Sequence, residues 1–203
     1  IKGDYNSISD IKRLKITRLF FKVKKIILLD RDGTINKKST KGRYIEKWQD
    51  FIFIRENLKA LVKLSKLGFQ FIIITNQAGI ARKVLTEKNL NLIHTKMQEK
   101  LKNKGIIIKD IFVSPDLWGT GSTTRKPAPG LFFAASKKYN LNLSQCIYIG
   151  DDIRDCQAAY NAGSNSIFLG KKEEIKLLNK KQYPLGVFKD MYKATNLINK
   201  FYK

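Results

Sequence analysis

The chain has 203 residues, of which 43% are hydrophobic and 28% are charged. This length and composition suit one globular domain, or one domain with tails, and exclude a disordered or fibrous protein. The formal net charge of +23 would ordinarily indicate a nucleic-acid partner. The two cysteines form no CxxC pair and no long uncharged apolar run is present, so we expect a cytoplasmic protein that does not enter a membrane.

Basic residues are concentrated at the two ends of the chain. Residues 1–22 are interpreted as a basic extension or linker remnant, and residues 23–203 as one folded domain that ends in basic helices. Between the ends, lysines are scattered singly over the expected helix faces, without a basic stripe interleaved with aromatic residues. This distribution favours a solvated surface, with nucleic-acid binding absent or non-specific.

The middle of the chain alternates apolar runs with amphipathic stretches, which is typical of an α/β domain with a parallel sheet. Five buried strands are predicted, at residues 26–29, 69–75, 106–113, 146–149 and 166–169. Helices are predicted between them, at residues 56–67, 86–104, 130–139 and 152–161. A flap or hairpin within residues 31–54 and an irregular segment at 114–129 follow two of the strands, at the carboxyl ends where such sheets bind ligands.

The first chemically informative motif is Asp30-Arg31-Asp32-Gly33, at the end of the first predicted strand. The spacing of two turns both carboxylates toward the same side. Two close carboxylates repel each other unless they share a proton or a cation. With a cation, Asp30 can act as a nucleophile and Asp32 as a proton donor and acceptor, although a plain surface turn has a similar composition.

A second acidic motif, Asp151-Asp152-Ile153-Arg154-Asp155, follows the fourth predicted strand. Carboxylates gathered at strand ends suit a hard cation, above all Mg²⁺. Asp152 or Asp155 alone would equally suit a helix N-cap. The motif is therefore interpreted together with the other strand ends.

Two further motifs carry groups that bind phosphate oxygens. Thr75-Asn76 ends the second predicted strand, and Arg125-Lys126-Pro127 leads into the helix predicted at residue 130. The order of all four motifs along the chain closely resembles that of the haloacid dehalogenase-like phosphatases. This resemblance implies a Rossmann-like parallel sheet of about five strands flanked by helices, with no cap domain, in a phosphatase domain of residues 23–203.

Within that superfamily, the segments LLDRDGTIN, ITNQAGIAR, RKPAPGLF and IGDDIRDCQAA resemble the histidinol-phosphate and heptose-bisphosphate phosphatase group. The resemblance covers about residues 25–170 and implies a role for each matched residue. Asp30 would be the nucleophile that forms an aspartyl phosphate, and Asp32 the general acid and base. Thr75 and Lys126 would hold the phosphoryl group, and Asn76 and Arg125 would face the substrate.

The cofactor that the resemblance implies is Mg²⁺, bound by Asp30, the backbone carbonyl of Asp32 and Asp151, with Asp152 as a further contact. Members of the group commonly carry a zinc loop between the third strand and the Arg-Lys-Pro motif. The matching positions in this chain hold no thiol or imidazole and cannot form a thiolate zinc site: Ser114, Asp116, Ser122 and Thr124. We therefore expect magnesium and no zinc.

The activity implied is phosphomonoester hydrolysis on a small phosphorylated sugar. D-glycero-D-manno-heptose 1,7-bisphosphate, dephosphorylated at position 7, matches best, and histidinol phosphate is the alternative within this group. A polynucleotide 3′-phosphatase or a nucleic-acid-binding module would instead use the basic charge. Residues 1–22 would fit the remnant of a linker to a sugar-processing domain, and His94, the only histidine, is interpreted as an ordinary helix position far from any motif.

Overall fold

The computed structural model describes residues 23–40 and 43–203, so the extension predicted at residues 1–22 lies outside the described residues. The strands are β1 Ile26–Leu29, β2 Gln70–Asn76, β3 Ile108–Ser114, β4 Ile147–Gly150, β5 Asn165–Leu169 and β6 Val187–Phe188. The helices are α2 Arg55–Lys66, α3 Glu87–Lys102, α4 Gly130–Tyr139, α5 Ile153–Asn161 and α6 Met191–Phe201. The predicted strands and helices between residues 26 and 169 are all present, with shifts of one or two residues at their ends.

The strands form one sheet in the order β3-β2-β1-β4-β5-β6, and every pair in it is parallel. The predicted α/β class with a parallel sheet is confirmed, while the sixth strand was not predicted. β6 has only two residues, which is too short for any alternation of apolar and polar side chains to show in the sequence. The strand order reverses between β1 and β4, and ligands bind at such a point in doubly wound sheets.

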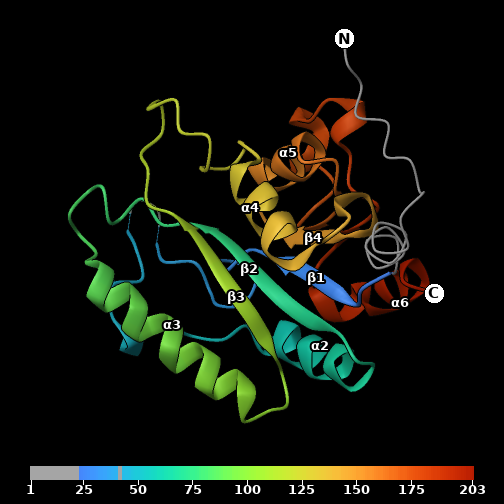
Figure 1. The fold of residues 1–203 in the computed structure, drawn as a ribbon, viewed down its shortest axis with the longest axis horizontal. Helices are drawn as coiled ribbons and strands as arrows, with labels where there is room; N and C mark the ends of the chain where they lie inside the picture. The colour runs from blue at the N-terminus through green and yellow to red at the C-terminus, as the bar shows by residue number, and fades with distance from the viewer. Residues whose placement is uncertain (1–22, 41–42) are drawn as a thin grey trace, which may run out of the picture.

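Two hydrophobic clusters cover the two faces of the sheet. In β1, Ile27 and Leu29 join one cluster with α2, α3 and α6, whereas Ile26 and Leu28 join the other cluster with α4 and α5. Successive strand residues point to opposite faces, so a strand buried on both faces must be apolar throughout. Figure 1 shows the resulting layers, with α4 and α5 on one side of the sheet and α2 and α6 on the other.

The flap predicted within residues 31–54 has a hairpin base. Asn36 pairs antiparallel with Phe53, and the main-chain N–H of Ile54 donates to the carbonyl of Ile35 over 2.9 Å. Phe51 stacks on Trp48 with ring centroids 5.1 Å apart and is buried in the core. The aromatic cluster thus ties the far strand of the flap to the domain and leaves residues 37–40 beside the carboxyl end of β1.

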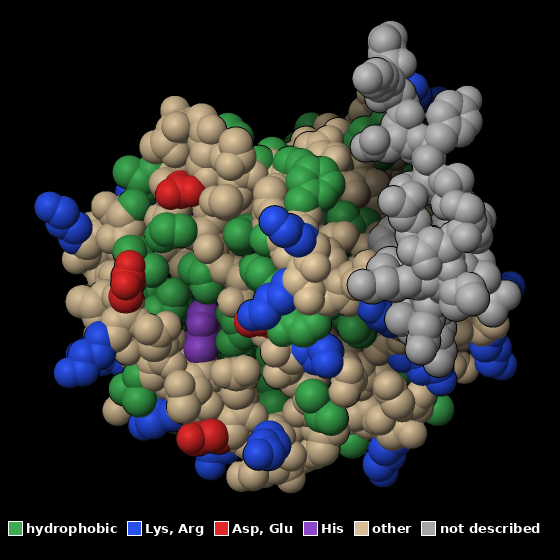
Figure 2. Space-filling model, in the orientation of Figure 1, with side chains coloured by type: hydrophobic (Ala, Val, Ile, Leu, Met, Phe, Trp, Pro, Cys, Tyr) green, Lys and Arg blue, Asp and Glu red, His purple; other side chains and the backbone are tan. Residues whose placement is uncertain are grey.

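The surface of the described residues shows no single basic stripe on the face drawn in Figure 2, where Lys and Arg side chains are spread over the molecule. Among the described residues, none of the helices has the length and apolar character required to cross a membrane.

Candidate active site

The acidic motifs meet where the strand order reverses. Asp30 follows β1 and Asp151 follows β4, two adjacent parallel strands whose carboxyl ends lie side by side. Gly33 has a φ of +88°, and a Cβ added there would collide with the Asp151 carboxylate. Glycine therefore lets the β1 turn pass close to the second acidic strand end.

Lys126 joins these strand ends from the loop before α4. Its Nζ donates to Asp30 Oδ1 at 2.7 Å, to Asp155 Oδ1 at 2.7 Å and to the Tyr148 hydroxyl at 2.6 Å. Lys126 is buried, and although burial lowers its pKa, the charges of Asp155 and Asp30 outweigh that effect and keep the ammonium protonated. One oxygen of Asp30 is thereby fixed by a permanent cation.

Three carboxylates form a cluster able to hold a metal ion. One oxygen each of Asp30, Asp151 and Asp155 lies within 4.8 Å of the others. Burial raises the pKa of Asp30 to about 7 against the lowering effect of Lys126, and burial raises the pKa of Asp151 to about 6 against that of Lys38. Asp151 Oδ1 is buried without a hydrogen-bond partner among the described residues. The cluster therefore carries excess negative charge and an unused oxygen, which suit a hard divalent cation.

Asp32 is held by a polar network from β2 and the flap. It accepts hydrogen bonds from Arg31 Nη2 at 2.8 Å, Gln77 Nε2 at 2.7 Å and Asn36 Nδ2 at 2.8 Å. Burial raises the pKa of Asp32, but Arg31 and these hydrogen bonds prevail and lower it below its ordinary value. The carboxylate is thus oriented and ionised, ready to accept a proton.

The interpretation of His94 as far from any motif is wrong. Its Nε2 lies 3.0 Å from Nη1 of Arg31, a fully buried guanidinium that also binds Asp32 and Gln77. Burial and the Arg31 charge lower the pKa of His94 to about 3, so the ring is neutral and can accept a hydrogen bond from Arg31. The contact joins residues 63 positions apart, which a single sequence cannot reveal.

Thr75 and Asn76 lie at the end of β2 as predicted. The Thr75 hydroxyl accepts a hydrogen bond from Gln77 Nε2 at 3.0 Å. The Asn76 side chain is paired with the main chain of Lys126, donating to its carbonyl at 3.2 Å and accepting from its N–H at 3.0 Å. Asn76 thus anchors Lys126 and also borders the cavities described below.

Asp152 is placed differently from Asp30 and Asp151, the predicted metal ligands that lie in the cluster of three carboxylates. Asp152 caps α5 and forms an ion pair with Arg154. It does not belong to the cluster of three carboxylates found among the described residues. Asp155 occupies that cluster instead. The sequence placed Asp155 in the second acidic motif but did not separate a metal ligand from a helix-capping residue at this position.

The positions that match the zinc loop converge in space. Asp116 Oδ2 accepts hydrogen bonds from three hydroxyls, those of Ser114, Ser122 and Thr124. The loop carbonyl of Asp116 in turn accepts from Arg125 Nη1 at 2.9 Å. Oxygen groups therefore organise this loop and fix the start of the Arg-Lys-Pro motif.

Two adjoining cavities open at this end of the sheet. The inner cavity has a volume of about 110 Å³ and is lined by Asp30, Asp32, Lys38, Thr75, Asn76, Lys126, Asp152, Arg154 and Asp155. The outer cavity has a volume of about 370 Å³ and is lined by Asp32, Lys38, Ser39, Thr40, Arg43, Tyr44, Ile45, Asn76, Gln77, Ala78, Arg125 and Arg154. The inner cavity combines carboxylates with a lysine, and the outer one gathers four cationic side chains.

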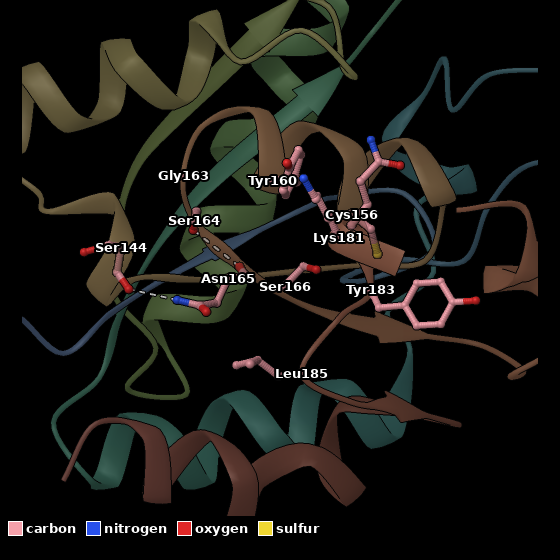
Figure 3. A pocket seen from close by; sticks show the side chains of 11 residues that line it. Ser144, Cys156, Tyr160, Gly163, Ser164, Asn165, Ser166, Lys181, Tyr183 and Leu185 are labelled. Atoms are coloured by element: carbon pink, nitrogen blue, oxygen red, sulfur yellow. Dashed lines mark hydrogen bonds between the residues drawn. The ribbon is translucent and has the colours of Figure 1, made fainter. Parts of the chain in front are cut away.

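A separate cavity of about 310 Å³ lies near the amino end of β5 (Figure 3). Its lining includes Ser144, Tyr160, Asn165 and Tyr183, and Asn165 Nδ2 donates to the Ser144 carbonyl at 2.8 Å. No carboxylate lines it among the described residues. The chemistry therefore belongs to the opposite end of the sheet.

Sequence reasoning missed several residues that support the site. Tyr148, Gln77 and Arg31 contact Lys126 or Asp32. Tyr148 precedes and Gln77 follows a recognised motif, and Arg31 lies inside one, but the sequence pattern assigned a role to none of them. Tyr148 is apolar enough to pass for a core residue of β4, and it is indeed fully buried. Its hydroxyl accepts a hydrogen bond from Lys126 Nζ at 2.6 Å, and the same ammonium lies over its ring, 5.2 Å from the centroid.

The strand order, the aspartate pair after β1, the lysine bound to the first aspartate and the acidic end of β4 together define a haloacid dehalogenase-like phosphatase. A family model described as polynucleotide kinase 3 phosphatase matches residues 25–184. The chain belongs to this family.

The individual relatives and solved structures that resemble this chain include several heptose-1,7-bisphosphate phosphatases. The chain is 39% identical over 155 residues to a D-glycero-alpha-D-manno-heptose-1,7-bisphosphate 7-phosphatase of Photorhabdus laumondii, covering 72% of this chain and 82% of the relative. It is 34% identical to a D-glycero-beta-D-manno-heptose-1,7-bisphosphate 7-phosphatase of Bordetella bronchiseptica, covering 68% and 76%. A crystal structure of a D,D-heptose 1,7-bisphosphate phosphatase from B. bronchiseptica, complexed with magnesium and phosphate, superposes with a TM-score of 0.77 at 29% identity, covering 87% of this chain and 99% of that one.

Proposed function

We propose that this chain is a Mg²⁺-dependent phosphatase that removes the 7-phosphate of D-glycero-D-manno-heptose 1,7-bisphosphate through an aspartyl-phosphate intermediate. The observation that carries the proposal is the position of Asp30, bound to Lys126 in a small cavity that adjoins a larger basic one. A nucleophile and a fixed cation suit the transferring phosphoryl group. The basic cavity suits a second phosphate.

In the first half of the reaction, an Asp30 oxygen attacks phosphorus and the bond from phosphorus to the sugar oxygen breaks. Lys126 and Thr75, which line the same cavity, bind the phosphoryl oxygens. Asp32, in its protonated form, gives its proton to the departing sugar oxygen. The products of this half are the sugar alcohol and the aspartyl phosphate.

In the second half, water attacks the phosphorus of the acyl phosphate and Asp32 takes its proton. The network of Arg31, Gln77 and Asn36 favours the ionised form of Asp32 that this step requires. Inorganic phosphate leaves and Asp30 is restored. Mg²⁺ held by Asp30 and Asp151, with Asp155 beside them, would neutralise charge on the phosphoryl oxygens.

The choice of substrate rests on the outer cavity and on the relatives. Relatives named heptose-1,7-bisphosphate 7-phosphatases include both alpha and beta types. Histidinol phosphate carries an ammonium group, which a cavity lined by Lys38, Arg43, Arg125 and Arg154 would repel. This charge favours a bisphosphate, although the chain is also 30% identical to a histidine biosynthesis bifunctional protein of Campylobacter jejuni, of which it spans 42%.

Steady-state kinetics on a substrate panel tests the proposal. The panel contains both anomers of the heptose 1,7-bisphosphate, the matching 7-phosphate, histidinol phosphate and a 3′-phosphorylated oligonucleotide. We expect the highest kcat/KM with one bisphosphate anomer, complete loss of activity in EDTA and recovery with Mg²⁺ but not Zn²⁺. Best turnover of histidinol phosphate or of the oligonucleotide would replace the proposed substrate, and activity that persists in EDTA would contradict the metal dependence.

A second prediction concerns Arg125. Its Nη1 is bound to the loop and its Nε is buried without a partner among the described residues, so the guanidinium is held at the outer cavity. Arg125→Ala should raise KM for the bisphosphate about tenfold, the scale of one charge-assisted hydrogen bond, and change kcat little. Arg125→Lys, which keeps the charge, is the matched variant. Its KM for the bisphosphate should lie between those of the parent and of Arg125→Ala. An unchanged KM in Arg125→Ala would disprove a substrate contact.

The remaining features stay proposals. The two cysteines of the chain are buried and unpaired, which suits a reducing cytoplasm. A sugar-processing partner domain attached through residues 1–22 would fit the substrate class.

A further inference from the structure

Both oxygens of the Asp152 carboxylate accept hydrogen bonds from one residue, Arg154. Oδ1 accepts from the Arg154 main-chain N–H at 3.0 Å and from Arg154 Nε at 2.8 Å, and Oδ2 accepts from Arg154 Nη2 at 2.6 Å. The contact is a fork of two parallel bonds, which fixes the direction of the guanidinium plane. Arg154 is the second residue of α5, so its side chain folds back over the start of its own helix.

This pair stands at the boundary between the two cavities. Arg154 and Lys38 are the two cations that line both of them, and Lys38 is engaged by Asp151 at 2.8 Å. The Nε and Nη2 side of Arg154 faces Asp152, and among the described residues no hydrogen bond engages its Nη1. The side chain is 40% exposed, so this edge of the guanidinium can be reached by a ligand.

The outer cavity has more positive charge than its own carboxylates can balance. Arg43 and Arg125 have no carboxylate partner among the described residues. Asp32, the acidic residue in the lining, already accepts bonds from Arg31, Gln77 and Asn36. Like charges that are fixed in one cavity repel each other, and an anion placed between them removes that repulsion.

We infer that Arg154 is a specificity residue that binds the second, non-transferred phosphate of the substrate, and that Asp152 is the positioning residue that aims it. The inference rests on the proposed function and deepens it. Arg125 lines the outer cavity from the loop before α4 and Arg154 from the first turn of α5, so the two can contact one phosphate from two directions. Asp152, whose oxygens are occupied by Arg154, then serves substrate binding instead of the metal contact predicted from the sequence.

Kinetics of Arg154→Gln, Asp152→Asn and the double variant test this assignment on the heptose 1,7-bisphosphate and the matching 7-phosphate. Arg154→Gln should raise KM for the bisphosphate about ten- to a hundredfold, the scale of bonds to a charged group. It should leave kcat and the constants for the 7-phosphate nearly unchanged. Asp152→Asn should also raise the KM for the bisphosphate, but by less than Arg154→Gln does. Asparagine is also a good N-cap, so this substitution keeps α5 intact.

Two measurements distinguish a positioning role of Asp152 from a role as a metal ligand: the energetic coupling between Asp152 and Arg154, and the affinity for Mg²⁺. If Asp152 acts through Arg154, the double variant should be no worse than Arg154→Gln alone. Calorimetric titration with Mg²⁺ alone should give the same dissociation constant for Asp152→Asn as for the parent. A weaker Mg²⁺ affinity in Asp152→Asn, or additive effects in the double variant, would overturn the positioning role.

Lys181→Gln is the matched control, because Lys181 is an exposed cation at the separate cavity near β5 and its loss should leave both KM values unchanged. A parent enzyme that does not prefer the bisphosphate would refute the proposed function itself. A parent that prefers the bisphosphate, with an Arg154→Gln variant that keeps the same preference, would refute only the assignment of Arg154.

Discussion

Asp30→Asn is expected to abolish turnover, with kcat lowered by at least about 10⁴-fold, because an amide cannot form the acyl phosphate. The substitution preserves size, and the asparagine carbonyl can still accept the hydrogen bond from Lys126 that Asp30 Oδ1 accepts in the parent. The fold should therefore be retained. Stopped assays with substrate labelled at the transferred phosphate should find acid-stable, alkali-labile label on the parent protein and none on Asp30→Asn.

Two control measurements distinguish loss of the nucleophile from loss of the fold in Asp30→Asn. Circular dichroism and a thermal melt of Asp30→Asn should match those of the parent, which excludes loss of the fold as the cause. Removing Asp30 also removes one carboxylate from a crowded cluster, so the variant need not be less stable than the parent. Turnover comparable to that of the parent would eliminate Asp30 as the nucleophile.

Asp32→Asn is expected to slow hydrolysis of the sugar phosphate by about 10²- to 10⁴-fold, the usual contribution of a positioned acid or base. The effect should depend on the leaving group. With p-nitrophenyl phosphate, whose phenolate needs no proton to depart, the first step should stay fast and the second slow. Stopped-flow absorbance should then show a burst of p-nitrophenolate close to the enzyme concentration, followed by slow release.

The parent enzyme is the control, and it should show no burst of that size because Asp32 also assists the second step. Equal losses of rate on the two substrates, without a burst, would mean that Asp32 does not transfer protons. The Arg31 and Gln77 contacts are expected to keep the asparagine side chain in the same place, so the comparison measures proton transfer rather than a misplaced side chain.

Much of the fold could be predicted because the relevant signals are local. Strands buried on both faces must be continuous apolar runs, and β1, β2 and β4 are such runs. β6 and the network around His94 could not be predicted. The first is too short to carry a pattern, and the second joins α3 to the β1 turn across 63 positions.

The sequence by itself determined the class of fold and the strand ends that carry Asp30, Thr75 and Asp151, because chain order and strand polarity bring such ends to one edge of a parallel sheet. Lys126 reaches this edge from the loop before α4. Only the tertiary structure decided which aspartates of the second acidic motif join the carboxylate cluster and which pair with other side chains. Asp155 turns to Lys126 and joins the cluster, whereas Asp152 turns to Arg154. Asp152 pairs with Arg154 of the same helix, whereas Lys126, the partner of Asp155, lies 29 positions away in the loop before α4. The position of Asp155 in the site therefore depends on how that loop packs against α5, which local spacing does not encode.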